Sequence, residues 1–505
     1  MKIEYKTIGK NVPRIGAPEK ATGAPVFCAD IELDQPLVIK VLRSARAHAR
    51  IIDIDTTRAL AVEGVVGVFT AADIPGKNLV GIINKDQPLL AVGKVRSIAD
   101  AVALVAAETQ TAAEKALAAI TVHYKDLPVI ADTDAALMPG AVNIHEKGNL
   151  LFTRRIKKGD VDAAFADCAH VIEKEYRTGM IEHNYLEPDA GVGYVDADGT
   201  LVIHASTQNP HYDHKELVTL LDLADDKVRI IQAATGGGFG SKLDLNVQGF
   251  IGLALYHLKR PVRCVYSREE AYLATSKRHP LTIRMKTGVD DSGKLLAMKV
   301  RAVCDTGAYG SYGIAVASRA AVHATGPYAI PNVDVICDCV YTNKPFCGAM
   351  RGFGAPQIAF AHESQIDLHA WALGLDPISI RQINGLRTGS EIATGQILTA
   401  SVGFSACLDA VKPHYDDAVN RWVNAATEPF KRRGVGVGGM WYGIGNTGVQ
   451  NPSTARIEMQ PDGHVTLFTG CADIGQGSTT VLVQIAAETL GIKPETIDVV
   501  VGDTK

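Results

Sequence analysis

Two stretches of this sequence carry the same order of structural signals. The first, "GVGYVDADGTLVIHASTQNPHYDHKELVTLLDLADDKVRIIQAAT", begins at Gly191, and the second, "ARIEMQPDGHVTLFTGCADIGQGSTTVLVQIAAETLGIKPETIDVVVGDT", begins at Ala455. Each predicts a strand, an Asp-Gly hairpin turn, a second strand, a loop with a glutamine, a helix and a closing strand. Unless the resemblance is a coincidence, the chain contains two related lobes. Their loops would then face a shared crevice, where open α/β sheets bind ligands.

A chain of 505 residues is too long for one ordinary core, so we expect several domains. Residues 1–128 alternate strand-like runs such as "LVIKVLRS", "GVVGVFT" and "DAVALVAAE" with one helical run, "TQTAAEKALAAI". Residues 129–160 read as an irregular linker, and 161–430 as a larger unit. Residues 431–505 read as the start of a third unit that is incomplete. The predicted fold class is therefore mixed, with α+β and α/β parts.

Composition excludes several classes of function. The net charge of −4 offers no broad attraction for nucleic acid. Of the nine cysteines, only Cys337 and Cys339 lie close together, which is too few for a zinc or iron–sulfur site. The N-terminal "MKIEYKTIGK" has no apolar signal region, and no apolar run approaches the ~18 residues of a membrane span. These features predict a cytoplasmic protein with reduced thiols and no membrane span.

A glycine-rich loop, "ATGGGFGSKLD", begins at Ala234 directly after a strand-like run. Glycines let backbone N–H groups approach a bulky ligand without steric conflict. The loop is not a Walker A sequence, because Gly240-Ser241-Lys242 has the wrong order. It is not a Rossmann fingerprint either, since no acidic ribose partner follows a second strand. By itself, the loop could equally be a structural turn.

Three further loops favour the ligand-binding interpretation. "IEHNYLEPD" begins at Ile181, "CGAMRGFGAPQ" at Cys347 and "CADIGQGSTT" at Cys471. The last precedes a predicted helix, whose first backbone amides would favour a phosphate or another anion. Four backbone-rich loops, each after a strand, predict a large extended cofactor that is bound mostly by main chain.

Together, "GGGFGSK", "EHNYLEPD", "MRGFGAPQ" and "GQGSTTVLVQIAAETLGI" resemble the molybdenum hydroxylases, the family of xanthine dehydrogenases and aldehyde oxidoreductases. The resemblance extends from about Lys10 to Lys505. It implies the large molybdopterin-binding subunit, with an N-terminal α/β hammerhead-like domain followed by two molybdopterin-binding lobes. It also implies a molybdenum cofactor in the cytosine dinucleotide form, whose metal is held by pterin sulfurs and needs no protein ligand.

The resemblance implies specific site residues. Gln208, the main chain of Phe239, and Arg351 would lie around the molybdenum without being its direct ligands. The remaining residues of the expected cofactor site are Gly237, Gly238, Gly240, Gly352, Gly475, Gln476, Gly477 and Ser478.

The implied reaction is hydroxylation with oxygen from water. Electrons would leave through [2Fe-2S] clusters and, in many relatives, FAD. No cluster-binding cysteine pattern occurs here, so these carriers are expected on partner subunits of a hetero-oligomer. The family's catalytic glutamate is expected beyond Lys505, and no catalytic residue is expected in this chain. Either the chain is a fragment of a longer polypeptide, which we favour, or the catalytic subunit is divided between two genes.

The expected class of substrate is inferred from three residues, Leu243, Arg319 and Phe353. Purine hydroxylases of this family carry a glutamate after the loop lysine, whereas Leu243 is more similar to aldehyde oxidoreductases. An arginine like Arg319 occurs in both groups, and Phe353 fits either stacking on a substrate or packing. We therefore expect oxidation of an aldehyde to its carboxylic acid. Hydroxylation of an N-heterocycle of the purine or nicotinate type, reductive hydroxybenzoyl-CoA-type chemistry and a non-catalytic subunit are the alternatives, in that order.

Overall fold

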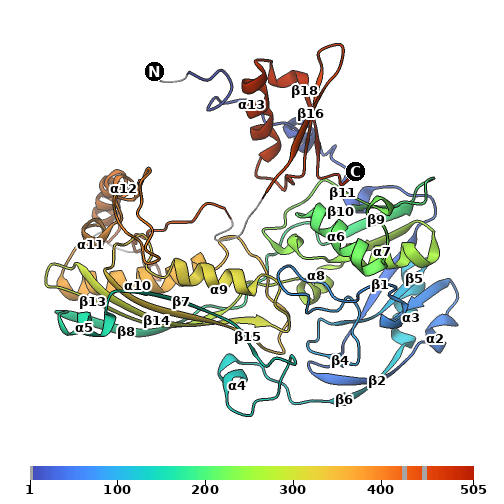
Figure 1. The fold of residues 1–505 in the computed structure, drawn as a ribbon, viewed down its shortest axis with the longest axis horizontal. Helices are drawn as coiled ribbons and strands as arrows, with labels where there is room; N and C mark the ends of the chain where they lie inside the picture. The colour runs from blue at the N-terminus through green and yellow to red at the C-terminus, as the bar shows by residue number, and fades with distance from the viewer. Residues whose placement is uncertain (1–3, 424–428, 446–451) are drawn as a thin grey trace.

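The computed structural model describes residues 4–423, 429–445 and 452–505. Its largest sheet has seven strands in the order β11-β10-β9-β12-β1-β5-β3 (Figure 1). Their bounds are β1 (Leu37–Arg43), β3 (Val65–Phe69), β5 (Ala101–Ala107), β9 (Ala190–Val195), β10 (Leu201–Ala205), β11 (Val228–Gln232) and β12 (Val262–Val265). Because β1 pairs in parallel with β12, the N-terminal unit and the next unit share one continuous sheet.

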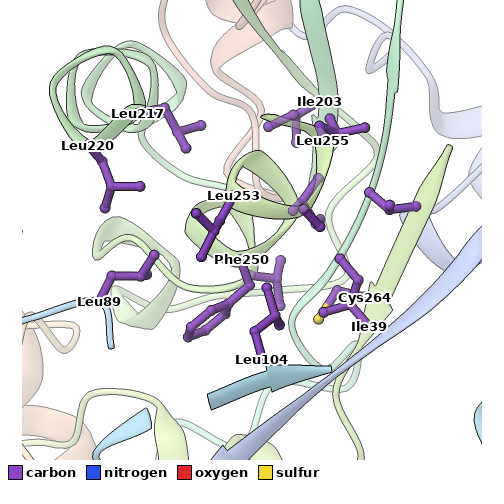
Figure 2. Packing of buried hydrophobic residues seen from close by; sticks show 14 of the residues in the cluster. Ile39, Leu89, Leu104, Ile203, Leu217, Leu220, Phe250, Leu253, Leu255 and Cys264 are labelled. Atoms are coloured by element: carbon purple, nitrogen blue, oxygen red, sulfur yellow. The ribbon is translucent and has the colours of Figure 1, made fainter. Parts of the chain in front are cut away.

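The core of this part lies between the sheet and helices α6 (Pro210–Leu221) and α7 (Val247–Leu258). The sequence of α7, "VQGFIGLALYHL", is apolar on nearly all sides, as expected of a buried helix. Figure 2 shows Phe250 and Leu253 of α7 among side chains from the strands and from α6. Gly252 permits this packing, because a Cβ there would lie 2.4 Å from Leu217 Cδ2.

The strand-like and helical runs expected in residues 1–128 form regular elements. The three expected strands are β1, β5 and β3, and the expected helix is α3 (Gln110–Ala119). A small second sheet has the order β4-β2-β6. The other elements of this part are α1 (Ala17–Thr22), β2 (Ala49–Asp55), α2 (Thr57–Leu60), β4 (Lys94–Val95) and β6 (Thr121–Asp126).

A five-stranded sheet, β7-β15-β14-β13-β8, forms a separate layer (Figure 1). Its strands are β7 (Leu150–Lys158), β8 (His170–Arg177), β13 (Leu281–Val289), β14 (Leu295–Gly307) and β15 (Asn332–Tyr341). The helices of this part are α4 (Thr133–Leu137), α5 (Val161–Ala166), α8 (Arg268–Ala274), α9 (Gly313–Val322), α10 (Ala355–Leu373), α11 (Pro377–Asn384) and α12 (Phe404–Ala418).

The sequence analysis expected residues 129–160 to be an irregular linker, and this expectation was wrong for part of the segment. Strand β7 lies within them and pairs antiparallel with β15 at the edge of the five-stranded sheet. Its sequence, "LLFTRRIKK", leaves several charged side chains exposed, so the alternation typical of a half-buried strand is weak. The domain boundaries at residues 128, 160 and 430 stay predictions.

The internal repeat is confirmed in three dimensions. In the first copy β9 and β10 form an antiparallel hairpin, and β10 pairs in parallel with β11 after α6. In the second copy β16 (Ala455–Met459), β17 (Val465–Thr469), α13 (Ser478–Leu490) and β18 (Ile497–Val501) are arranged in the same way. Even the register agrees, since Val195 faces Leu201 and Met459 faces Val465.

The two copies meet at β11. Ile231 forms an antiparallel bridge with Asp503, and the Asp503 carboxylate accepts two hydrogen bonds from the Arg229 guanidinium, at 2.9 and 2.5 Å. The second lobe is therefore anchored to the edge of the seven-stranded sheet. No helix in the described parts of the chain is long and apolar enough to cross a membrane.

Candidate cofactor site

The glycine loop after β11 adopts a backbone conformation that few side chains permit. Gly237, Phe239 and Gly240 all have positive φ, at 95°, 54° and 113°. A Cβ on Gly238 would lie 2.4 Å from Gln208 Oε1, and one on Gly240 would lie 2.5 Å from the carbonyl oxygen of Ala349. The loop therefore lies between the segments of Gln208 and Ala349. Only glycines at positions 238 and 240 allow these segments to lie so close to its backbone.

Gln208 holds the loop from one side. Its side-chain oxygen accepts a hydrogen bond from the N–H of Gly240 at 2.8 Å, and its main-chain N–H donates to the carbonyl of Lys242 at 2.9 Å. Within the described residues, the Gln208 Nε2 group donates to no protein acceptor. This amide is therefore available to an oxygen atom of a ligand, as the expected role of Gln208 requires.

The loop that begins at Cys347 holds it from the other side. It has the same Gly-Phe-Gly sequence, and Gly352, Phe353 and Gly354 all have positive φ, at 93°, 52° and 96°. The N–H of Arg351 donates to the carbonyl of Phe239 at 3.0 Å, so the two loops are joined directly. The Arg351 side chain is exposed, and its guanidinium has no hydrogen bond or ion pair with described residues.

Beneath the loop lies a buried ion pair that sequence analysis did not assign. Lys242 is fully buried, and its Nζ lies 2.9 Å from Glu187 Oε2 and 2.6 Å from Ser206 Oγ. The same Glu187 oxygen accepts from the N–H of Gly236 at 2.7 Å. The Lys242 ammonium also lies 4.7 Å from the centre of the Tyr185 ring. "EHNYLEPD" therefore supports the glycine loop through its second glutamate.

The other acids of "EHNYLEPD" are also engaged with the protein. Glu182 forms a buried ion pair with Lys277 at 2.7 Å, and burial lowers the pKa of Lys277. Asp189 accepts hydrogen bonds from Tyr185 at 2.5 Å and Asn246 at 2.8 Å. Burial raises the pKa of Asp189. Each of these carboxyl groups therefore has a structural partner.

The expected second cofactor loop, Gly475 to Ser478, begins α13. The Asp473 carboxylate already accepts hydrogen bonds from the N–H groups of Gly475 at 2.9 Å and Thr479 at 3.2 Å. Burial alone would raise the pKa of Asp473, but these backbone hydrogen bonds lower it. The main-chain N–H groups of Gln476 and Ser478 have no acceptor among the described residues. An anion at the start of α13 would therefore bind next to the Asp473 carboxylate. The sequence analysis had expected the first N–H groups of this helix to be available, and only some of them are.

The two expected loops lie at equivalent places in the repeat. Gln208 and Gln476 each precede the first residue of their helix, Pro210 or Ser478, by two positions. Gln232, at the end of β11, connects the first copy to the second of these loops, because its Nε2 donates to the carbonyl of Asp473 at 3.1 Å.

Two of the three expected substrate residues lie together. The Arg319 guanidinium lies 6.0 Å from the Phe353 ring centre and 4.5 Å from that of Tyr442. It is buried and donates to the carbonyls of Gly443 at 3.0 Å and Gly445 at 2.8 Å. The third, Leu243, ends a short 3-10 turn, Ser241–Leu243, and is half-buried. Arg319 is thus held by main-chain carbonyls that sequence analysis did not foresee.

The donors of this site fit a pterin-held metal. No group of three or more His, Cys, Asp or Glu side chains that could hold a metal ion occurs among the described residues. In the glycine loop, the N–H groups of Gly237, Gly238 and Phe239 have no acceptor in the described part of the chain. Main-chain donors and one free amide suit a ligand that brings its own metal ligands.

Comparisons with known proteins agree with this geometry. Residues 22–128 match the aldehyde oxidase and xanthine dehydrogenase a/b hammerhead domain. Residues 144–385 and 410–505 each match a molybdopterin cofactor-binding domain. The chain is 47% identical to the nicotinate dehydrogenase large molybdopterin subunit of Eubacterium barkeri, over 81% of this chain and 96% of that protein. It is 37% identical to a probable xanthine dehydrogenase subunit of Bacillus subtilis, over 96% of this chain and 65% of that protein.

Solved structures give the same result. The aldehyde oxidoreductase of Desulfovibrio desulfuricans ATCC 27774 superposes with a TM-score of 0.93 at 30% identity, covering 98% of this chain and 56% of that one. Quinoline 2-oxidoreductase from Pseudomonas putida 86 gives 0.87 at 27% identity, covering 100% of this chain and 67% of that one.

The chain belongs to the molybdenum hydroxylases, so the resemblance seen in the sequence and the expected mixed fold with an N-terminal hammerhead domain are confirmed. Within that family it is a molybdopterin-binding subunit of the xanthine, aldehyde or nicotinate type of oxidoreductase. It spans about two thirds or less of several relatives, including the Bacillus subtilis protein and the aldehyde oxidoreductase.

Proposed function

We propose that this subunit hydroxylates an aromatic N-heterocycle of the nicotinate class with oxygen from water. Leu243, an apolar side chain directly after the buried Lys242, argues against a purine substrate. The observation that carries the choice of nicotinate is the 47% identity to a nicotinate dehydrogenase subunit over 96% of that protein. A purine hydroxylase of this family has a glutamate there, and an unpaired polar partner weakens recognition of a ring that needs one. Similarity then favours nicotinate, because the nicotinate dehydrogenase subunit is 47% identical whereas the aldehyde oxidoreductase of Megalodesulfovibrio gigas is 32% identical.

In this proposal the chain's own residues hold and orient the reacting partners. The Gln208 amide, the N–H of Phe239 and the Arg351 guanidinium would hold the cofactor, and Phe353 would contact the substrate. When bound, the cofactor supplies oxygen transfer and accepts two electrons. Gly238 keeps the Gln208 amide in place to hold the cofactor, since a Cβ at position 238 would lie 2.4 Å from Gln208 Oε1 and would displace it.

We further propose that none of the acids of "EHNYLEPD" is the general base. Glu187 and Glu182 are held in ion pairs with Lys242 and Lys277, and Asp189 is buried against Tyr185. A general base must reach the proton that it removes and must be free to accept it. We therefore assign the base to a segment outside this chain's residues, as the family pattern implies.

The partners and the cofactor form are part of the same proposal. The cytosine dinucleotide form would extend over the Gly475–Ser478 loop, and [2Fe-2S] and FAD subunits would receive the electrons. All nine cysteines lie in described segments, and none forms a disulfide. Unpaired thiols fit a reducing compartment, so we place the complex in the cytoplasm.

Aldehyde oxidation is the second candidate. Leu243 is equally compatible with it, and the backbone superposes on an aldehyde oxidoreductase with a TM-score of 0.93. Fold likeness of this kind is shared by enzymes with different substrates, so it weighs less than sequence identity.

The test is a substrate panel on the complex purified with its natural partner subunits. Nicotinate, xanthine and benzaldehyde are compared by kcat/KM, with ¹⁸O-labelled water to trace the oxygen in the product. Preference for nicotinate with label from water supports the proposal. Preference for benzaldehyde would establish the second candidate, and preference for xanthine would reject the interpretation of Leu243.

A further inference from the structure

The N-terminal segment, residues 5–16, lies along one face of helix α13, more than 460 residues away in sequence (Figure 1). The Thr7 N–H and hydroxyl donate to Glu488 Oε2 at 2.6 and 2.8 Å. The Gln484 amide donates to the carbonyls of Thr7 at 2.8 Å and Lys10 at 3.1 Å. The N–H of Ile15 donates to Thr480 Oγ1 at 3.0 Å.

These contacts follow the geometry of a helix. Thr480, Gln484 and Glu488 are spaced by four residues, so they lie on one side of α13. The N-terminal segment therefore runs from the end of the helix towards its start. We call residues 5–16 the strap.

At the start of the helix the strap reaches the cofactor loop. Arg14 Nη2 lies 3.5 Å from Asp473 Oδ1, and the Arg14 side chain is 38% exposed. Two of its guanidinium nitrogens, Nε and Nη2, are buried without a hydrogen-bond partner. Asp473 in turn fixes the N–H groups of Gly475 and Thr479, so Arg14 and the loop are linked through a single carboxylate.

The second lobe needs external support. Within residues 452–505 its buried apolar core comprises six residues, Val465, Leu467, Val483, Ala486, Ala487 and Ile497, with Leu482, Ile492 and Val499 partly buried against them. Every residue of β16 is exposed. Three strands and one helix with so small a core are marginal alone. The strap supplies contacts that the core lacks, and it supplies them along the helix that carries the loop.

Charge explains why an arginine is needed at this point. The start of a helix attracts anions, and Asp473 already places a negative charge there. A phosphate group approaching Gln476 and Ser478 would be repelled by an uncompensated carboxylate, whereas the adjacent Arg14 offsets that charge.

We propose that Arg14 and Asp473 are positioning residues for the cofactor: Asp473 sets the conformation of the Gly475–Ser478 loop, and Arg14 on the strap neutralises Asp473 so that a phosphate can bind beside it. This inference rests on the proposed cofactor-binding role of the loop. It adds the N-terminal strap to a site otherwise built from the two repeated lobes.

The test uses the complex with its partner subunits and two readouts besides turnover. The first is pterin retained per folded protein after dialysis, measured as fluorescence of the oxidised pterin. The second is hydrogen exchange of the Gly475–Thr480 amides. We expect Arg14→Gln and Asp473→Asn each to lower retained pterin by ~10-fold, a size typical of losing a supporting contact around a bound group. Arg14→Lys, which keeps the charge, should restore most of the retention.

Glu488→Gln is the matched control, because it weakens the strap at the far end of α13 and leaves the Arg14–Asp473 contact intact. We expect it to speed exchange around Thr7 without changing the loop or the retained pterin. If Glu488→Gln loses as much pterin as Asp473→Asn, the strap acts only by stabilising the lobe, and the inference fails. A fully loaded Asp473→Asn complex would also overturn it, whereas a wild-type complex without pterin would overturn the proposed function as well.

Discussion

The main-chain N–H of Arg351 donates a hydrogen bond to the main-chain carbonyl of Phe239 across 3.0 Å. Each residue belongs to a loop in which a phenylalanine with positive φ lies between two glycines, Gly238 and Gly240 in one and Gly352 and Gly354 in the other. The bond makes the two loops one surface. It therefore places the backbone of Arg351 directly against the backbone of Phe239.

Gly238 provides the most direct test of that surface. In Gly238→Val the new Cβ would lie 2.4 Å from Gln208 Oε1 and would break the hydrogen bond between Gln208 and Gly240. We expect folded protein that contains little or no molybdenum, measured by metal analysis of the purified complex. Gly179→Val is the matched control, because a Cβ there meets nothing within 4 Å. Full molybdenum content in the Gly238 variant would argue against this placement of the cofactor.

The buried pair of Lys242 and Glu187 should be important for stability. Removing one partner leaves an uncompensated buried charge, so Lys242→Met should lower the free energy of unfolding by about 3–5 kcal/mol. Lys299→Met removes an exposed ion pair of similar length, 2.8 Å to Asp162, and should cost no more than about 1 kcal/mol. Urea denaturation measures both. Equal effects of the two substitutions would mean that the Lys242 pair contributes no more than a surface contact.

Glu187 also distinguishes a structural role from catalysis. A general base typically supplies ~10²–10⁴ in rate, and its loss removes one limb of the pH–rate profile. We expect Glu187→Gln to lower the stability of the protein. In the fraction that retains its cofactor, the dependence of kcat on pH should keep its shape. Disappearance of that limb would identify Glu187 as the base and overturn the assignment made above.

Leu243 should control the choice between heterocycles. Leu243→Glu introduces the carboxylate that purine hydroxylases carry, and the half-buried position can accommodate it. We expect the ratio of kcat/KM for xanthine to that for nicotinate to rise by ~10-fold or more, because a polar site strongly favours a ring that can pair with it. Leu243→Met should leave the ratio unchanged. An unaltered ratio in the glutamate variant would show that position 243 does not contact the substrate.

Asp244 should make stability depend on pH. Burial raises its pKa to about 7, against the hydrogen bond that it accepts from Ser311 at 2.6 Å. The folded chain thus keeps a proton that the unfolded chain has lost, so stability should fall as pH rises from about 4 to about 7. The loss is no more than about 4 kcal/mol. In Asp244→Asn the fall should be smaller by this contribution, because other buried carboxyl groups such as Asp189 also have raised pKa values, while exposed Asp162→Asn should retain the full fall. Thermal unfolding between pH 4 and pH 8 compares them.

Local patterns in the sequence were enough to predict the repeat, the loops and three strands of the N-terminal unit. Hairpin turns, glycine runs and apolar periodicity depend on neighbouring residues, so they can be interpreted without a fold. This is why β1, β5 and β3 and the two copies of the repeat lie where the sequence places them. Strand β7 escaped prediction because an exposed edge strand carries little apolar alternation.

The contacts between groups that are distant in sequence could not be predicted, because they depend on how whole elements pack. The Lys242–Glu187 pair joins residues 55 positions apart, and the contact between Arg14 and Asp473 joins opposite ends of the chain. Arg319 is held by the carbonyls of Gly443 and Gly445, which no local pattern connects to it. The packing of whole helices and strands determines which buried charges and main-chain acceptors pair. The spacing of residues in the sequence does not predict these pairs.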